Sequence, residues 1–432
     1  MGRSDFVEKT IVILSTLDTR GGQTAFLKSL IQKRGHRTLL VDVSTGSEPS
    51  ISSDVSAGEV AGFVGEDIKE IRKMKDTERV SSIMIGGVIQ LIKDLLKRKE
   101  IDGIISLGGA SNTAVATAIM RFIPFGIPKV MLSSTAAMPA YAAGYFGTKD
   151  IAMIHAVVDL AGFNPLVKDL LERAAGAICG MVEMGGGLAS LRRTDQKKDT
   201  IALTEFKFSE ECCFHVRHLL EEKGFEVISF HAQGIGDQVM EELIEEGLFQ
   251  GVMDIVPAGV GETILGGNRA TAPSRLEKAG EIGIPQLITP CGFDFLSCGP
   301  LERGDRGDPL WVSKNIKSRK LFVADAFRVQ ARTTAQELRE IAAEVARKLN
   351  KAKGPAAILV PLKGWSSLNQ EGMPLYDPEA DQAFIDELKT RLDSKIPIVE
   401  LDLHLNSREF AQEAVNRFLG LYGEGHRKKD LH

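Results

Sequence analysis

The sequence predicts an α/β protein built from two Rossmann-like parallel-sheet subdomains that are related by an internal repeat. Short apolar, β-branched runs alternate with longer amphipathic stretches along almost the whole length, as in strand–helix units of parallel sheets. A pattern of strand, helix, glycine turn and strand occurs twice, with Gly35 in the first copy matching Gly224 in the second. The 432 residues are enough for about two to four domains.

Buried strands are expected where apolar, β-branched runs lie between turn-forming residues. In the first subdomain they are predicted at Thr10–Leu17, Thr38–Val43, Gly103–Leu107, Lys129–Ser133 and Ile151–Val158. In the second they are predicted at Thr200–Thr204, Glu226–Phe230, Gly251–Val256, Pro285–Thr289, Lys320–Ala324, Ala357–Pro361 and Pro397–Leu401. Helical spacing of apolar residues predicts helices at Gln23–Arg34, Thr113–Arg121, Glu211–Lys223, Ala335–Asn350 and Asp377–Asp393.

The repeat also suggests where the chain divides. The first copy carries extra residues before its third shared strand, and Ile83–Lys99 predicts an added amphipathic helix there. The general similarity of all strand–helix–strand units is the alternative explanation for the match. The polar stretch RRTDQKKD at 192–199 is the predicted linker, which gives a nucleotide-binding subdomain at 1–195 and a second subdomain at 196–432.

Composition excludes several classes of protein. The 53 basic and 58 acidic residues give a net charge of −5, so no overall positive field favours nucleic acid. Five cysteines without a CxxC pair fit neither a disulfide framework nor a structural zinc site, and they indicate a reducing compartment. The chain starts without a signal-peptide pattern and has no run of 18 uncharged apolar residues. A cytoplasmic protein without a membrane partner is therefore expected.

A glycine-rich turn after the third predicted strand is the strongest candidate for a ligand site. In open parallel sheets ligands bind beyond the carboxyl ends of the strands. Here Gly108 and Gly109 lead through Ser111, Asn112 and Thr113 into a predicted helix. Glycines let the backbone approach an anion, and the helix dipole with nearby hydroxyls favours phosphate. The alternative is a plain glycine turn with Ser111 or Asn112 as the helix N-cap.

Two further candidates follow the first and second strands. In STLDTRGG, Asp18 could hold a hydroxyl or a magnesium-bound water, Thr19 a phosphate oxygen, and Arg20 could offset charge. Capping of the next helix by Asp18 or Thr19 is the alternative. Asp42 closes the second strand, where nucleotide-binding folds often place a ribose-binding carboxylate. A solvated loop acid is the other interpretation of Asp42.

A hydroxyl cluster ends the fourth predicted strand. Ser133, Ser134 and Thr135 would face the glycine turn, where they could bind a ligand or cap local backbone. The chain contains neither GxxxxGK[ST] nor GxGxxG at the first strand. Neither an ordinary P-loop ATPase nor an ordinary dinucleotide dehydrogenase is supported.

The second subdomain also carries polar residues at its predicted strand ends. They are His231, Glu262, Arg275, Asp294 and Ser366. Convergence of a histidine with carboxylates could serve acid–base chemistry or bind magnesium, although each residue alone is more often structural. His231 occupies the position in the repeat that Asp42 has in the first copy. Helical spacing of Cys213 with apolar neighbours favours core packing of that thiol, and no motif orients a base toward Cys291 or Cys298.

Several motifs together resemble one known family. They are IVILSTLDTRGGQTAFLKSLI, DGIISLGGASNTAVATAIMRFIPFGIPKVMLSSTA, DIAMIHAVVDLAGFNP, AAGAICGM, FHAQGIGDQVMEELI, GGNRATAPSRLEKAGEIGIPQLITP and ILVPLKGWSSL. They span nearly the whole chain and are similar to the ATP-binding domain family of the tomato mosaic virus resistance protein. The resemblance implies two Rossmann-like subdomains, ATP in the amino-terminal one, a tendency to form a homodimer, and the stand-alone form without a following barrel domain.

The resemblance assigns the nucleotide role residue by residue. It falls on Asp18, Thr19, Gly108, Gly109, Ser111, Asn112, Thr113, Ser134 and Thr135. Most relatives have GGSGGT at the glycine turn, so Asn112 replaces a glycine, and asparagine tolerates left-handed geometry. Larger departures occur in the second subdomain, at Pro290–Phe295 and Arg328–Thr334, which implies that a substrate held there would differ.

Together these observations predict an ATP-binding protein that uses magnesium. As an enzyme it would pass a phosphoryl or adenylyl group to a small acid in a cleft between the subdomains, with His231, Glu262 and Asp294 as acid–base or metal groups. One alternative is a non-catalytic nucleotide sensor that binds a protein partner. Another is a lyase or hydrolase that acts on a phosphorylated or acyl small molecule without ATP.

Overall fold

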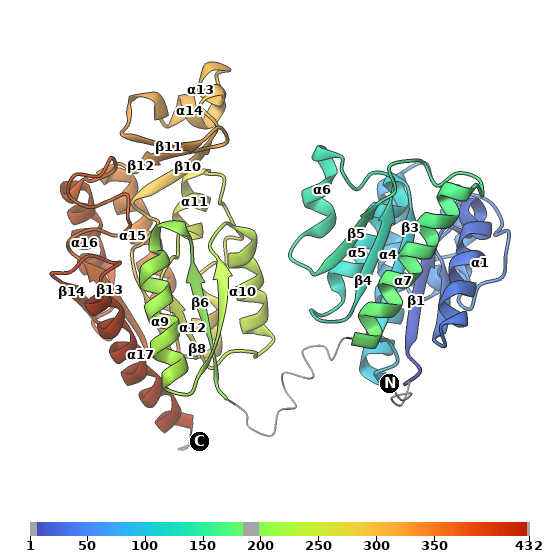
Figure 1. The fold of residues 1–432 in the computed structure, drawn as a ribbon, viewed down its shortest axis with the longest axis horizontal. Coiled ribbons are helices and arrows are strands. Elements are labelled where there is room, and N and C mark those ends of the chain that lie inside the picture. The colour runs from blue at the N-terminus through green and yellow to red at the C-terminus, as the bar shows by residue number, and fades with distance from the viewer. Residues whose placement is uncertain (1–6, 185–197, 430–432) are drawn as a thin grey trace. The chain divides into compact units, whose positions relative to one another are not determined.

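The computed structural model describes residues 7–184 and 198–429, and the chain divides into two compact units. Unit 1 is Met1–Asp195 and unit 2 is Gln196–His432. Figure 1 shows a sheet with helices on both faces in each unit. Most of the predicted linker, 192–199, lies outside the described residues.

Unit 1 contains a five-stranded parallel sheet in the order β2-β1-β3-β4-β5. Its strands are β1 (Thr10–Ser15), β2 (Arg37–Asp42), β3 (Gly103–Gly108), β4 (Lys129–Ser133) and β5 (Ile151–His155). Its helices are α1 (Leu17–Lys33), α2 (Ala57–Gly62), α3 (Ile68–Ile71), α4 (Thr77–Arg98), α5 (Ala110–Phe122), α6 (Pro139–Phe146) and α7 (Pro165–Met184). All five predicted strands are confirmed. The predicted extra helix is also present as α4, and it begins earlier than expected because Asp76 caps it.

Alternation along the strands creates two cores in unit 1. Ile11 and Ile13 of β1 pack with α1 and α7 on one face, whereas Val12 and Leu14 pack with α2, α4 and α5 on the other. This period of two is what a sheet covered on both sides requires. Burial of each such side chain contributes about 1.5–3 kcal/mol. Packing on both faces therefore fixes the position of β1 and of the residues that follow it.

Unit 2 contains a six-stranded parallel sheet in the order β14-β13-β9-β8-β6-β7. Its strands are β6 (Thr200–Glu205), β7 (Glu226–His231), β8 (Gly251–Asp254), β9 (Gln286–Ile288), β13 (Ala356–Pro361) and β14 (Ile398–Leu401). The longer helices are α9 (Glu210–Glu222), α10 (Ile235–Glu245), α11 (Gly259–Leu265), α15 (Ala335–Leu349), α16 (Pro378–Arg391) and α17 (Arg408–Lys429). The short elements are η1 (Lys207–Ser209), α12 (Lys278–Ile282), α13 (Glu302–Asp305), α14 (Pro309–Ser313) and η2 (Ile316–Ser318).

The two sheets share one topology. The order β2-β1-β3-β4 in unit 1 corresponds to β7-β6-β8-β9 in unit 2. In each unit the last helix packs beside the first, α7 on α1 and α17 on α9. The predicted fold class, two Rossmann-like parallel-sheet subdomains, is therefore confirmed, and the matching strand order supports the repeat.

One predicted strand belongs to a different sheet. A three-stranded antiparallel sheet in the order β10-β12-β11 is formed by β10 (Phe295–Gly299), β12 (Arg328–Arg332) and β11 (Leu321–Asp325). The segment predicted as Lys320–Ala324 was expected in the parallel series and is instead β11. The reason is local, because only residues 326–327 separate β11 from β12, and so short a connection forms a hairpin.

Candidate functional site

The topological switch point of unit 1 lies between the neighbouring strands β1 and β3. The chain leaves β1 through α1 toward β2, and it leaves β3 through α5 toward β4 on the other side of the sheet. Because these helices cover opposite faces, the loops after β1 and β3 diverge at the carboxyl edge. Ligands of open α/β sheets bind at such a point.

The turn between β3 and α5 leaves its backbone open. Gly109 is the N-cap of α5, and it has no side chain to accept a hydrogen bond from the first-turn amides. The alternative that Ser111 or Asn112 caps the helix is therefore wrong. A Cβ on Gly109 would meet only Ser134 Oγ, at 3.7 Å, among the described residues. The positive end of the α5 dipole thus faces a turn that no capping side chain fills.

Asn112 and Thr113 support this turn from inside the protein. Asn112 Nδ2 donates to Leu107 O at 2.7 Å and to Ser106 Oγ at 3.1 Å, and its side chain lies against Gly108. Thr113 is fully buried, and its Oγ1 lies 2.7 Å from Ser133 Oγ. The predicted phosphate contact of Thr113 disagrees with this position, because its buried hydroxyl joins α5 to β4 instead.

Three predicted hydroxyls lie nearer the surface of the same edge. Ser111 is exposed on the first turn of α5, and Ser134 and Thr135 are partly exposed after β4. Ser134 N donates to Gly108 O at 3.1 Å, which holds the two turns together. Thr135 Oγ1 lies 3.1 Å from Tyr145 OH on α6. Gly108, Gly109, Ser111 and Ser134 are thus brought together as predicted.

Asp42 stabilises the start of α1 instead of facing solvent. Its Oδ1 accepts hydrogen bonds from Leu17 N at 3.2 Å and Ser44 N at 2.9 Å, and Ser44 Oγ accepts from Asp18 N at 3.1 Å. Asp42 is only 1% exposed. The predicted ribose contact and the solvated loop acid both disagree with this burial, and neither Asp18 nor Thr19 is the N-cap of α1, which is Thr16.

The first turn of α1 is joined to the loop after β5. Arg20 donates to Asp159 Oδ1 at 3.1 Å. Thr19 is exposed, while Asp18 accepts from Ser47 N through Oδ2 and has a buried Oδ1 without a partner among the described residues. In the β5 loop, Val157 has φ +64° and is 77% exposed. A β-branched residue rarely adopts this conformation, and such strain is concentrated at ligand-binding loops.

The equivalent turn in unit 2 is filled by the protein itself. Residues 257–262, which follow β8 and start α11, are all buried. A Cβ on Gly259 would meet Thr271 Cγ2 at 2.7 Å and Asp237 Oδ1 at 3.2 Å. Phe206 and Phe295 stack in parallel nearby, with 5.7 Å between ring centroids. An anion therefore has no equivalent seat at the switch point of unit 2.

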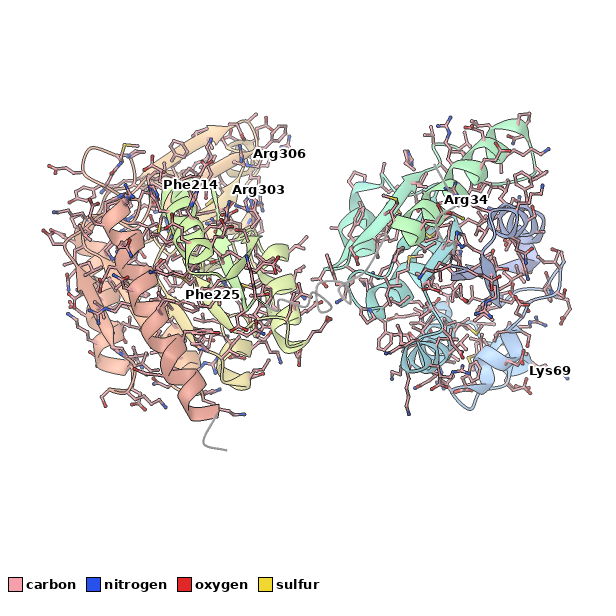
Figure 2. All side chains as sticks on the ribbon, turned by 60° about the horizontal axis from the view of Figure 1, so that its bottom comes forward. Arg34, Lys69, Phe214, Phe225, Arg303 and Arg306 are labelled. Carbon is pink, nitrogen blue, oxygen red and sulfur yellow. The ribbon has the colours of Figure 1, made fainter. Side chains whose placement is uncertain are left out.

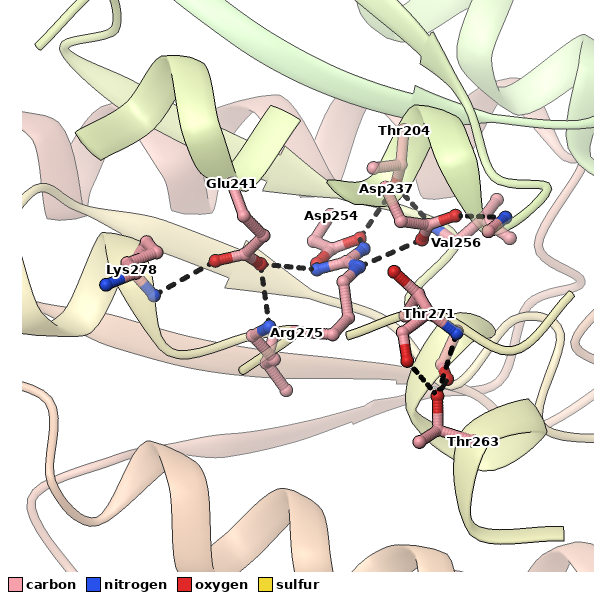
Figure 3. A network of polar contacts seen from close by, with 12 residues as sticks. Thr204, Asp237, Glu241, Asp254, Val256, Thr263, Thr271, Arg275 and Lys278 are labelled. Atoms are coloured by element: carbon pink, nitrogen blue, oxygen red, sulfur yellow. Dashed lines mark hydrogen bonds and ion pairs between the residues drawn. The ribbon is translucent and has the colours of Figure 1, made fainter. Parts of the chain in front are cut away.

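Arg275 lies at the centre of a buried polar network in unit 2 (Figure 3). Its guanidinium binds Asp254 through two nitrogens at 2.6 and 2.7 Å, Asp237 at 2.9 Å and Glu241 at 3.1 Å. Burial alone would lower the pKa of Arg275, but the surrounding carboxylates hold it well above its usual value. Because every partner is inside the protein, the network joins α10, β8 and the loop before α12.

Glu262 and Asp294 are buried as well, in separate places. Glu262 Oε1 accepts from Arg269 Nε and from Ser297 N, both at 2.8 Å. Asp294 accepts from Ser366 Oγ at 2.6 Å, and burial raises its pKa. Neither carboxylate reaches the surface, so the structure does not bring them together with His231 as the predicted acid–base group.

His231 lines a pocket of about 580 Å³ at the carboxyl ends of β6 and β7. The other lining residues are Glu205, Phe206, Lys207, Glu210, Phe214 and Arg217. Arg217 donates to Glu205 Oε2 at 2.6 Å. Within 7–184 and 198–429, no group of three or more His, Cys, Asp or Glu is arranged to hold a metal ion.

Comparison with known proteins identifies the family. A model described as the N-terminal domain of an uncharacterised protein family (UPF0261) matches residues 9–186, and the corresponding C-terminal domain model matches residues 198–422. The chain belongs to the UPF0261 family. A UPF0261 protein of Clostridium tetani is 36% identical over 96% of this chain and 99% of its own length.

This UPF0261 chain is also similar to the plant protein that the motifs suggested. The ToMV resistance protein Tm-1(GCR237) of Solanum lycopersicum is 33% identical over 73% of this chain and 41% of the tomato protein. The family resemblance is thereby confirmed, while ATP binding stays a prediction. A solved UDP-N-acetylglucosamine 2-epimerase from Rickettsia bellii is 13% identical over 65% of this chain and 79% of its own, with a TM-score of 0.21 that supports no inference.

Sequence reasoning missed several residues that line the pocket beside His231 in unit 2. Lys207, Phe214 and Arg217 were not singled out, although Glu210, Phe214 and Arg217 recur at the spacing of one helix face. All five cysteines are free and buried, and the core packing predicted for Cys213 is confirmed. No helix among the described residues is long and apolar enough to cross a membrane.

Proposed function

We propose that unit 1 binds ATP, with the phosphates at the turn between β3 and α5. The observation that carries this proposal is the uncapped N-terminus of α5 behind Gly108 and Gly109, at the switch point of a parallel sheet. The contrast with α1 supports it, because Asp42 and Ser44 already occupy the first amides of that helix.

The α5 amides, two hydroxyls and Asp18 have roles in this proposal. The first-turn amides of α5 and the hydroxyls of Ser111 and Ser134 would donate to phosphate oxygens. Magnesium is the cation that ATP brings, and it prefers oxygen ligands with several waters. Asp18 fits that preference, because its Oδ1 is buried without a partner among the described residues and is free to accept from a metal-bound water.

Calorimetric titration with ATP and magnesium tests the proposal directly. Gly109→Leu should abolish binding without unfolding the chain, because the new side chain would project toward Ser134 and cover the turn. Gly180→Leu is the matched control, since a Cβ at Gly180 of α7 meets nothing within 4 Å. Unchanged affinity in Gly109→Leu, with a normal unfolding temperature, would refute the placement.

Three uses of a nucleotide site are separable by experiment. An ATP-dependent enzyme would form a phosphorylated or adenylylated small acid, whereas a nucleotide sensor would bind ATP saturably without product. A lyase or hydrolase acting on a phosphorylated metabolite would use the same turn for its substrate, so that metabolite would displace ATP. Product analysis followed by competition with phosphorylated metabolites distinguishes these outcomes.

We also propose that the protein works in the cytoplasm, as a homodimer. Five free, buried cysteines are suited to a reducing compartment. The dimer rests on the family resemblance, and sedimentation equilibrium of the purified chain tests it. A monomer at all concentrations would exclude a functional dimer.

A further inference from the structure

The pocket in unit 2 has the size of a small-molecule site, and its lining combines two aromatic side chains with several charged ones. Its volume of about 580 Å³ lies within the range of about 300–1,000 Å³ that ligand sites occupy. Glu205 and His231 are the last residues of β6 and β7 and lie opposite each other in register. Glu210, Phe214 and Arg217 come from one face of α9, whose amino-terminal end carries Phe214 (Figure 2). The wall is therefore built by rigid elements.

The charges in this pocket are only partly paired. Arg217 and Glu205 neutralise each other. Lys207 Nζ and the ring nitrogens of His231 have no polar partner in the described parts of the chain. A second hollow of about 420 Å³ also includes Lys207, so its ammonium lies beside both spaces. The Glu210 carboxylate lines both spaces as well, but it forms no ion pair with Lys207 in the described chain, so Lys207 is the cation available to an incoming anion.

The pocket also has an apolar wall. Phe214 lines the pocket and is 54% exposed, so its ring is accessible to a ligand. Its ring makes edge contacts with His215 and His218 on the same helix, at 5.4 and 5.6 Å between centroids. A planar ligand could pack on the exposed ring while its polar end reaches Lys207.

The internal repeat explains why the pocket is open. In unit 1, residues 44–54 cover the corresponding surface of α1. Ser47 N donates to Asp18, Ser50 Oγ lies where a Cβ on Gly21 would be, and Lys28 pairs with Asp54 at 3.1 Å.

These three α1 positions correspond in the repeat to pocket residues of unit 2. Asp18 corresponds to Lys207, Gly21 to Glu210, and Lys28 to Arg217. In unit 2 only residues 232–234 separate β7 from α10, so this connection has no counterpart of segment 44–54 to cover the pocket-lining face of α9. Segment 44–54 of unit 1, which includes the Asp54 carboxylate, therefore fills the surface that stays open as the pocket in unit 2.

We propose that this pocket binds a small organic acid with a planar body. The carboxylate lies on Lys207 Nζ, the body packs on the Phe214 ring, and His231 exchanges a hydrogen bond with a polar substituent. The site is contained in unit 2 and does not depend on nucleotide binding in unit 1.

Fluorine NMR of 4-fluorobenzoate with the full chain tests this site, in the absence of ATP. Lys207→Gln should weaken binding about tenfold or more, because it removes the only unpaired cation that lines the pocket in the described chain. Phe214→Ala should weaken it severalfold through loss of the ring contact. Lys223→Gln, an exposed lysine just after α9, is the matched control and should leave the affinity unchanged.

The contradicting results are equally definite. Absence of saturable binding by the unchanged chain would overturn the proposal. So would equal binding of 4-fluorobenzamide, which lacks the negative charge, or an unchanged affinity in both Lys207→Gln and Phe214→Ala. Circular dichroism confirms that the variants are folded. Loss of ATP binding in Gly109→Leu with normal fluorobenzoate binding would support the pocket of unit 2 as a site independent of the nucleotide site in unit 1.

Discussion

Asp381 is a buried carboxyl group that ties the stability of unit 2 to pH. Burial raises its pKa from 3.8 to about 6, although Arg332 and Asn369 both donate to it. Because the folded state holds this proton more tightly than the unfolded state, its contribution to stability is full below about pH 4 and is lost as pH rises through about 6. The change is about 3 kcal/mol.

Urea unfolding between pH 4 and pH 7 measures this effect. Asp381→Asn should remove the decline in the free energy of unfolding that Asp381 causes across that range. Asp386→Asn, on an exposed position of the same helix, should retain it. A decline of equal size in Asp381→Asn would show that Asp381 is not the responsible group.

The buried thiols make a second prediction at this scale. Burial raises the pKa of Cys213 and Cys298 to about 12 and that of Cys179 to about 11. Since the thiolate is the reactive form, all five cysteines should resist Ellman's reagent in the native protein and react together on unfolding. A Ser313→Cys variant supplies an exposed thiol as the positive control. Rapid reaction of the unchanged chain would contradict the buried assignment.

Single-residue roles were the hardest to predict from sequence. The partners of a strand-end acid come from distant positions, as with Asp294 and Ser366, which are 72 residues apart. Sequence spacing could not show that Glu262 would pair with Arg269 inside the core, or that Asp42 would accept a hydrogen bond from the first amide of α1. Gly109 could be anticipated, because a glycine pair between a strand and a helix has a local cause.

At the N-terminus of α5, the residue that would best stabilise the helix is one that would prevent phosphate binding. An aspartate is a better N-cap than glycine by a few tenths of a kcal/mol. Gly109→Asp should therefore leave the unfolding temperature unchanged or slightly raised, while its negative charge excludes phosphate. Calorimetry with ATP and a thermal melt measure both quantities. A variant that still binds ATP would show that phosphate lies elsewhere.

Among secondary-structure elements, the strands of the parallel sheets were easier to predict than the antiparallel strands and the helix starts. The parallel strands are long apolar runs, so their positions follow from composition within a few residues. The antiparallel sheet was missed because β10 and β12 contain Ser297, Gly299 and Gln330, which interrupt the apolar pattern. The start of α1 was placed too late, at Gln23, whereas the helix begins at Leu17 and continues through Gly21 and Gly22 after a kink at Arg20.

At the scale of the whole molecule, each unit has cores of its own. The clusters of unit 1 and unit 2 share no residue. ATP should therefore stabilise unit 1 alone, by about 2.7 kcal/mol when free ATP is about 100 times its Kd. Hydrogen exchange with and without ATP measures this by segment. Equal protection of unit 2 strands would contradict the assignment of ATP to unit 1.

The segment 44–54 makes the two similar units different at their candidate ligand sites. The two units differ in which surface is covered: segment 44–54 covers α1 after β2 in unit 1, and the protein itself fills the turn after β8 in unit 2. A saturated chain should consequently hold triphosphate at the turn after β3 and not at the equivalent turn after β8.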